Sequence, residues 1–109
     1  MAVFSFSSDD SDVFWVRNGL FRMILSRAEV AARSNEDIEE LKMASALQIL
    51  TFDDLDAAQR QRIFDLVFAG TQKLRQDIEN GIDLEEGVRG GVQEMLDGLI
   101  KFLSDHSPK

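Results

Sequence analysis

Apolar residues recur every three or four positions along most of the chain, which is the spacing of the buried face of an amphipathic helix. The pattern predicts four helices, over about residues 13–32, 35–50, 56–79 and 84–103. Strand-like alternation is rare, and the predicted connections are short, which favours antiparallel neighbours. The expected fold class is therefore all-α: a single-domain, mostly antiparallel four-helix bundle that includes the whole chain, residues 1–109.

Signals for helix ends support these boundaries. Ser34 and Asp56 each precede an Asp or Gln by three residues, which is the spacing of a capping box. Asn80-Gly81 is typical of a left-handed stop at the end of a helix. Gly70, inside the third helix, indicates a close crossing with another helix.

The segment around Asn18-Gly19 has two interpretations. Asn-Gly between apolar runs is the strongest short signal for a β-hairpin, which would make strands of Val13–Val16 and Leu20–Leu25. The flanking residues do not alternate, however, and the helical spacing continues to Ala32. We therefore expect one helix with a kink at this point and keep the hairpin as the alternative.

The two ends of the chain lie outside the helical pattern. Val3-Phe4-Ser5-Phe6 alternates, so we expect residues 1–10 to form an extended arm laid across the bundle. Residues 104–109 are expected to form a frayed tail. Glycines between residues 87 and 91 leave open whether the fourth helix begins near Leu84 or only after them.

The composition adds a strong acid surplus: twenty Asp and Glu against twelve Lys and Arg, with a formal net charge of −8. Such a charge repels the phosphates of nucleic acids and anionic lipids, and it attracts basic partners. No apolar stretch approaches the roughly 20 residues of a membrane span. The first residues lack the basic start and long apolar run of a signal peptide. We expect a cytoplasmic protein with no nucleic-acid or membrane partner.

Catalytic and metal-binding motifs do not accompany the acids. The chain has no Cys and one His, His106, which we interpret as a solvated residue of the tail, so the usual zinc ligand sets are missing. Glu36 and Glu39 have the spacing of a di-iron motif without its His. Asn80–Asp83 departs from a calcium-binding loop at its ligand positions. The sequence therefore predicts no enzyme, no cofactor and no metal site.

Most of the acids fall in four clusters, at residues 9–12, 36–40, 53–56 and 77–86. The helix macrodipole stabilises a few acids at each helix start, but it does not account for the runs at 36–40 and 77–86. Solubility and a surface for a basic protein both explain the surplus. The second explanation predicts these partner-binding residues: Glu36, Asp37, Glu39, Glu40, Asp53, Asp54, Asp56, Asp83, Glu85 and Glu86.

The basic residues of the first predicted helix have a simpler interpretation. Since they advance by five or six residues, they spiral around the helix and do not form one patch. We expect them to pair with acids of neighbouring helices: Arg17, Arg22, Arg27 and Arg33.

In size, predicted helix count, acidity and lack of catalytic motifs, the chain resembles the small acidic immunity proteins of bacterial contact-dependent or secreted-toxin systems. The resemblance implies a non-catalytic protein that binds and neutralises a cognate basic toxin, for example a nuclease. The chain departs from the nuclease-colicin immunity proteins, which use paired tyrosines in their binding helix, because it contains no Tyr.

Trp15 is the only Trp, and the residues around it are more apolar than one helix face can bury. Either Phe4, Phe6 and Trp15 close one end of the core, which we expect, or they are partly exposed and bind something. The second arrangement gives an alternative function. The protein would then be a helical adaptor or a homo-oligomeric structural protein that uses an apolar patch near Trp15.

Overall fold

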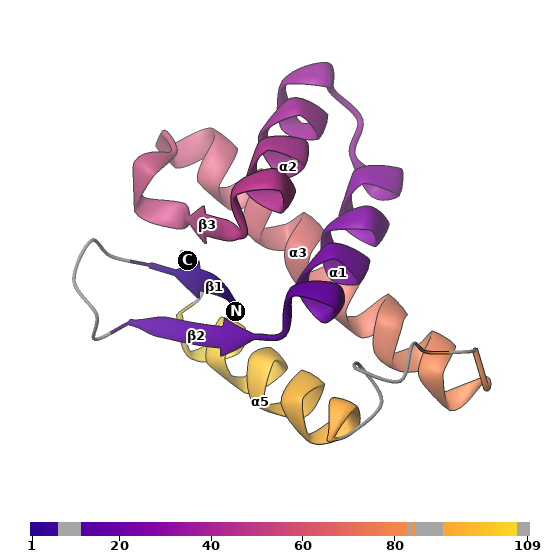
Figure 1. Ribbon diagram of the computed structural model, residues 1–109. Coiled ribbons are helices and arrows are strands. Elements are labelled where there is room, and N and C mark those ends of the chain that lie inside the picture. Colours follow the sequence, from indigo (N-terminus) through magenta and orange to yellow (C-terminus); the bar gives the residue numbers. More distant parts are fainter. Residues whose placement is uncertain (7–11, 83, 85–90, 107–109) are drawn as a thin grey trace.

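The computed structural model describes residues 1–6, 12–82, 84 and 91–106, and Figure 1 shows how its helices and strands are arranged. The elements are β1 (Ala2–Ser5), β2 (Val13–Val16), α1 (Asn18–Ala31), α2 (Asn35–Leu47), β3 (Ile49–Thr51), the short 3-10 helix η1 (Phe52–Asp54), α3 (Ala57–Glu79) and α5 (Val92–Asp105). Within the described residues, no helix is both long enough and apolar enough to cross a bilayer.

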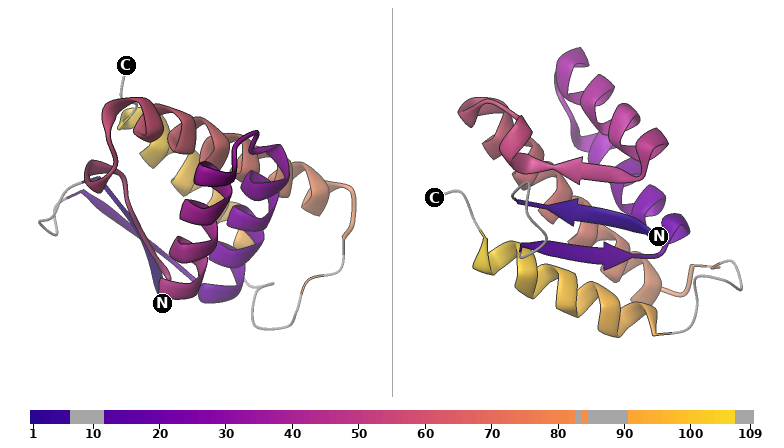
Figure 2. Two further views of the ribbon diagram at one scale, coloured as in Figure 1. Left: turned by 90° about the horizontal axis from the view of Figure 1, so that it is seen from above. Right: turned by 60° about the vertical axis from the view of Figure 1, so that its left-hand side comes forward.

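The three strands form one mixed sheet in the order β2-β1-β3. β1 is central: it is antiparallel to β2, where Val3 faces Trp15, and parallel to β3, where Val3 faces Ile49. The helices lie to one side of this sheet, as the view from above in Figure 2 shows. The fold is therefore α+β, and the prediction of an all-α four-helix bundle was wrong.

The first predicted helix starts too early because a strand occupies its first turn. Val13–Val16 is β2, whose backbone pairs with β1, and α1 begins only at Asn18. A run of four apolar residues is too short to distinguish the spacing of a helix from that of a strand. The segment that it pairs with therefore decides which of the two forms. That partner is the alternating segment that we expected to be a separate arm. The hairpin alternative was right that Val13–Val16 is a strand and wrong about Leu20–Leu25, which lies within α1 because Asn18 and Gly19 open that helix.

The second predicted helix ends at Leu47 and not at residue 50. Gln48 takes a left-handed φ of 61° and turns the chain, so that Ile49–Thr51 becomes β3. The turn presents the Gln48 carbonyl oxygen to the backbone N–H of Val3, at 3.1 Å. This hydrogen bond holds the start of β3 beside β1, and so the apolar residues after α2 complete the sheet.

The predicted signals at helix starts were confirmed. Ser34 Oγ accepts a hydrogen bond from the backbone N–H of Asp37 at 3.3 Å. The Asp56 carboxylate accepts one from the backbone N–H of Gln59 at 2.8 Å. The stop after α3 was confirmed as well, because Gly81 has a left-handed φ of 88°.

Helices α1 and α3 cross closely at Gly70, as predicted. A Cβ atom at this position would lie 2.8 Å from the carbonyl oxygen of Ile24 and 3.2 Å from the backbone nitrogen of Ala28. Both atoms belong to the backbone of α1, which cannot rotate away as a side chain would. The crossing distance therefore depends on the missing side chain of glycine.

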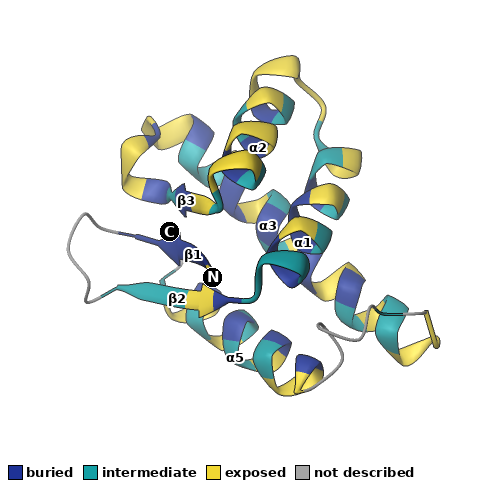
Figure 3. Ribbon diagram, viewed as in Figure 1, coloured by how far each residue is buried: buried dark blue, intermediate teal, exposed yellow. Residues whose placement is uncertain are grey.

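The core fills the space between the inner face of the sheet and the helices, as the burial colours of Figure 3 show. Phe4 of the central strand packs on Phe21 of α1, with ring centroids 4.8 Å apart. The largest fully buried side chains are Phe4, Phe21, Phe52, Leu20, Ile24, Leu25, Leu41, Leu50, Ile63, Leu74, Leu96 and Leu99.

Helix α5 begins directly after the glycines and reaches Asp105, so residues 104 and 105 continue the helix instead of fraying. His106 packs against Phe6 and Phe102, with ring centroids 4.9 and 4.4 Å away. Its Nε2 also lies 3.2 Å from the Asp12 carboxylate. The expectation of a solvated histidine was therefore wrong, since this ring closes one end of the core.

Candidate functional site

A row of side chains crosses the open face of the sheet. Trp15, Val3 and Ile49 are cross-strand neighbours in β2, β1 and β3, so their side chains lie on the same face. Trp15 is 56% exposed and Ile49 is 43% exposed, whereas Val3 between them is 7% exposed. The row is therefore an apolar strip with its two ends open to solvent.

The expectation that Trp15 belongs to the core was wrong because of strand parity. Successive side chains of a strand point to opposite faces. Val16 and Phe4 are fully buried, and Phe14, which pairs with Phe4, is packed against the core. Trp15 stands between the two inward positions of β2 and points outward.

Helix α2 carries two further exposed apolar side chains close to the edge strand β3. Leu47, its last residue, is 65% exposed, and Met43, one turn earlier, is 53% exposed. Only Gln48 separates Leu47 from Ile49, so the end of the helix adjoins the edge strand of the sheet. We call the set of Val3, Trp15, Met43, Leu47 and Ile49 the apolar face.

Three of the predicted acids stand on α2 beside the apolar face. Glu36 and Glu39 are exposed, and Glu40 is half-buried. Glu39 precedes Met43 by one turn, and Glu40 precedes Leu47 by two, so these pairs share one side of the helix. We call Glu36, Glu39 and Glu40 the acidic rim. The outer side of α2 thus changes from acidic to apolar along its length.

The glutamates of the acidic rim form no close ion pair in the described part of the chain, although Glu36 interacts electrostatically with Arg62 of α3 and helps to raise its pKa. No ion pair there includes Glu36, Glu39 or Glu40. Lys42 is the one basic residue of α2, and it is exposed. The rim therefore keeps a negative charge that a partner can meet.

The acids of the third cluster follow the edge strand. Asp53 and Asp54 are exposed in η1, directly after β3. Asp56 is exposed as well, but its carboxylate is engaged as the cap of α3. The structure therefore places acids at both ends of the stretch from α2 to η1.

Asp37 does not belong to this surface. Its side chain is 4% exposed and lies against Arg62, with Nε to Oδ2 at 3.0 Å and Nη2 to Oδ1 at 3.3 Å. The hydrogen bond from Arg62 lowers the pKa of Asp37 below its ordinary value, although burial opposes the shift. Asp37 therefore ties α2 to α3. The remaining predicted acids, Asp83, Glu85 and Glu86, lie outside the described residues.

Several acids elsewhere in the described residues are paired, whereas Glu29, Glu94 and Asp105 take part in no ion pair. Asp77 of α3 lies 2.9 Å from Arg27 of α1 and 3.2 Å from Lys73, and both partners lower its pKa, Arg27 most. Arg75 contacts Asp97 of α5 at 2.6 Å. The expected pairing of basic residues on the first helix with neighbouring acids is confirmed for Arg27.

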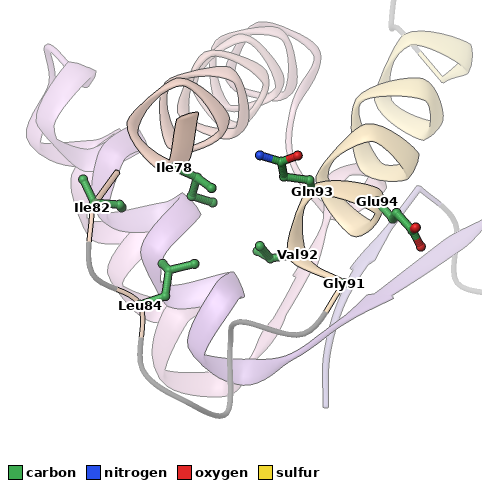
Figure 4. Close-up of a pocket in the computed structure, with 7 residues that line it drawn as sticks. All are labelled: Ile78, Ile82, Leu84, Gly91, Val92, Gln93 and Glu94. Carbon is green, nitrogen blue, oxygen red and sulfur yellow. The ribbon is translucent and has the colours of Figure 1, made fainter. Parts of the chain in front are cut away.

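A hollow of about 670 Å³ lies between the end of α3 and the start of α5. In Figure 4 the side chains of Ile78, Leu84 and Val92 surround it, while Glu94 points away. Ligand pockets usually add a few converging polar groups to such apolar walls, and this lining offers the amide of Gln93. No group of three or more His, Cys, Asp or Glu that suits a metal ion occurs in the described ranges.

An exposed apolar patch near Trp15 was only the alternative expectation from the sequence, and the sheet that carries this patch was not predicted. The signal was the short alternation of residues 3–6, which indicates a strand, beside a second apolar run that a strand needs as partner. Comparisons with known proteins do not add a relative: no family model matches the chain, and neither the curated proteins nor the solved structures include a match.

Proposed function

We propose that this protein is a non-catalytic binding protein whose partner is a basic protein. More specifically, we propose that it is a cytoplasmic immunity protein that neutralises a toxin. The observation that supports this most is the acidic rim, whose carboxylates have no ion-pair partner among the described residues and stand beside exposed apolar side chains. Protein interfaces combine such an apolar centre with a polar rim.

The physical mechanism is inhibition by occupancy. An acidic surface speeds the encounter with a basic partner, because the long-range field orients the two molecules before contact. A toxin that acts on nucleic acid has a basic groove for phosphates, and an acidic protein competes for that groove. The inhibitor then covers the active site or binds beside it, without chemistry of its own.

The test is binding to the protein encoded by the adjacent gene. The two proteins are co-expressed, purified together, and their affinity is measured at about 50 and 500 mM salt, since added salt shortens the range of surface charges. We expect a complex that weakens at least tenfold over this range. An adjacent gene whose product is not basic, or does not bind, contradicts the proposed function.

The exposure of Trp15, at 56%, favours a second candidate. The protein would self-associate through the apolar face as a structural protein or adaptor. Apolar association does not weaken with salt, so sedimentation at the same two salt concentrations separates the candidates. A strict monomer in both removes the second one.

A further inference from the structure

The apolar face is too exposed to be explained by stability. Trp15, Leu47 and Met43 are each more than half exposed. Trp15 lies on β2 at one edge of the sheet, and Leu47 and Met43 lie on α2, which leads into β3 at the other edge. Grouped exposed apolar side chains mark interaction sites more often than scattered ones do. Aromatic side chains in particular supply much of the binding energy when a partner buries them.

The charges around the apolar face indicate what would bury it. Glu36, Glu39 and Glu40 lie on the same side of α2 as the apolar residues, and Asp53 and Asp54 follow the far end of β3. Lys42 is the only basic residue that α2 adds. Arg17 follows β2 directly, Arg62 of α3 interacts with Glu36, and Arg60 contacts the backbone oxygen of Asp53 at 3.4 Å. On the outer side of α2 itself, three glutamates stand with one lysine, so this part of the surroundings is negative.

A second copy of the chain fits this arrangement poorly. In a two-fold dimer the same patch lies on both sides of the interface, so the acidic rims would approach each other. Each copy also carries a formal net charge of −8. Like charges brought together at an interface oppose association.

We propose that the apolar face binds a protein surface whose centre is apolar and whose edge carries Lys or Arg. Trp15 and Ile49 form the buried centre of the contact, and the acidic rim on α2 pairs with the basic edge. This inference rests on the proposed function and locates its interface on β2, β3 and α2. Asp77 and Asp97, which pair with arginines of other helices, take no part.

Trp15 makes the inference directly measurable. It is the only Trp of the chain, so intrinsic fluorescence reports on this face alone. The probe is an amphipathic helical peptide with leucine on one side and lysine on the other. The control peptide has glutamate in place of lysine. Emission wavelength and quenching by acrylamide are followed as each peptide is added.

Two matched double variants distinguish the effect of where the charges lie from the effect of the overall net charge. Glu36→Lys with Glu39→Lys reverses the acidic rim, and Glu29→Lys with Glu94→Lys makes the same charge change on α1 and α5. We expect the lysine peptide to shift Trp15 emission to the blue and to reduce quenching. The rim variant should weaken this binding about tenfold, and the control variant by less than about twofold.

Several outcomes overturn the inference. One is an unchanged Trp15 signal when the lysine peptide binds. Another is equal weakening by both double variants. A blue shift that grows with protein concentration alone, together with a dimer in sedimentation, assigns the face to a second copy. If the peptide result holds but the adjacent gene product does not bind, the proposed function fails and the surface stands.

Discussion

The side of the molecule built from α3 and α5 and the side built from α2 and β3 differ in their ion pairs and in their exposed apolar residues, although, among the described residues, Glu94 and Asp105 of α5 also have no ion pair and Asp37 of α2 has one. On the first side, Asp77 and Asp97 are within 3 Å of arginines. On the second, the glutamates of the acidic rim have no ion pair in the part of the chain that the structure describes. Apolar residues differ likewise, since Leu96 and Leu99 of α5 are fully buried whereas Leu47 is mostly exposed.

This difference shows that net charge alone does not locate a binding surface. Solubility needs charge anywhere on the surface, and pairing an acid with an arginine removes its long-range field. A carboxylate that stays unpaired next to exposed apolar groups has a cost in self-repulsion that solubility does not require. The position of the unpaired acids is therefore more informative than their number.

Two leucines of α2 give the sharpest test of the contrast between buried and exposed apolar residues. Leu41 is fully buried and Leu47 is 65% exposed. Leu41→Ala should lower the free energy of unfolding by about 3 kcal/mol, through lost burial and the cavity that remains. Leu47→Ala should change it by less than about 0.5 kcal/mol. Urea unfolding followed by circular dichroism measures both, and equal losses would mean that Leu47 is part of the core.

Two glycines test how tightly the side built from α3 and α5 is packed. At Gly70 an added Cβ meets the backbone of α1 at 2.8 Å, whereas at Gly98 it meets the ring of Phe14 at 3.3 Å. Gly70→Ala should cost about 2 kcal/mol, because backbone must shift. In Gly98→Ala the ring can yield, and better helix propensity offsets the contact, so the change should stay within about 0.5 kcal/mol. Thermal unfolding distinguishes the two, and a stabilised Gly70→Ala would contradict the close crossing.

Within the acid cluster at residues 36–40, we expect Asp37 to contribute to stability and the exposed glutamates to contribute to binding. Its side chain is buried against Arg62, so Asp37→Asn should cost about 1–2 kcal/mol at neutral pH, while Glu39→Gln should cost almost nothing. Because Arg62 lowers its pKa in the folded state, the stabilisation by Asp37 is present above the ordinary carboxyl pKa of 3.8. This stabilisation is lost as the pH falls through the lower pKa that Asp37 has in the folded state.

Urea midpoints at pH 7 and in acid check this prediction. The difference between wild type and Asp37→Asn should shrink toward acid pH, whereas Glu39→Gln should follow the wild type throughout. A constant difference at all pH values would show that the carboxylate charge has no role.

The smallest expected effect has the opposite sign. Gln48 holds a left-handed φ of 61° where the chain turns from α2 into β3. Gln48→Gly should raise stability by about 0.5–1 kcal/mol, because glycine adopts this conformation without the steric cost of a Cβ. Gln48→Ala keeps the Cβ and serves as the control. A gain in both variants would point to the side chain and not to the backbone angle.

The sequence predicted the features that depend on neighbours along the chain. The caps at Ser34 and Asp56, the stop at Gly81 and the close crossing at Gly70 each follow from one or a few adjacent residues. The sheet depends instead on which segments meet in space. Ile49–Thr51 is too short to show a period, and it becomes a strand only because β1 lies beside it.

In the candidate site, too, the features that depend on adjacent residues were predicted, and those that depend on distant residues were not. The acids of α2 were visible as a run in the sequence, and the structure keeps three of them on the surface. The inward turn of Asp37 follows from Arg62, which is distant in the sequence. The exposure of Trp15 was only the alternative expectation, because the central row of the apolar face requires the register of three strands, and a shift of one residue would have buried Trp15.

The central position of β1 also has a consequence for synthesis on the ribosome. β1 precedes β3 in the chain and cannot pair with it until α1 and α2 have been made, since parallel strands need a long connection. The row from Trp15 through Val3 to Ile49 is thus assembled late, although two of its members are made early. A partner that binds this row would therefore recognise the folded chain and not a nascent one.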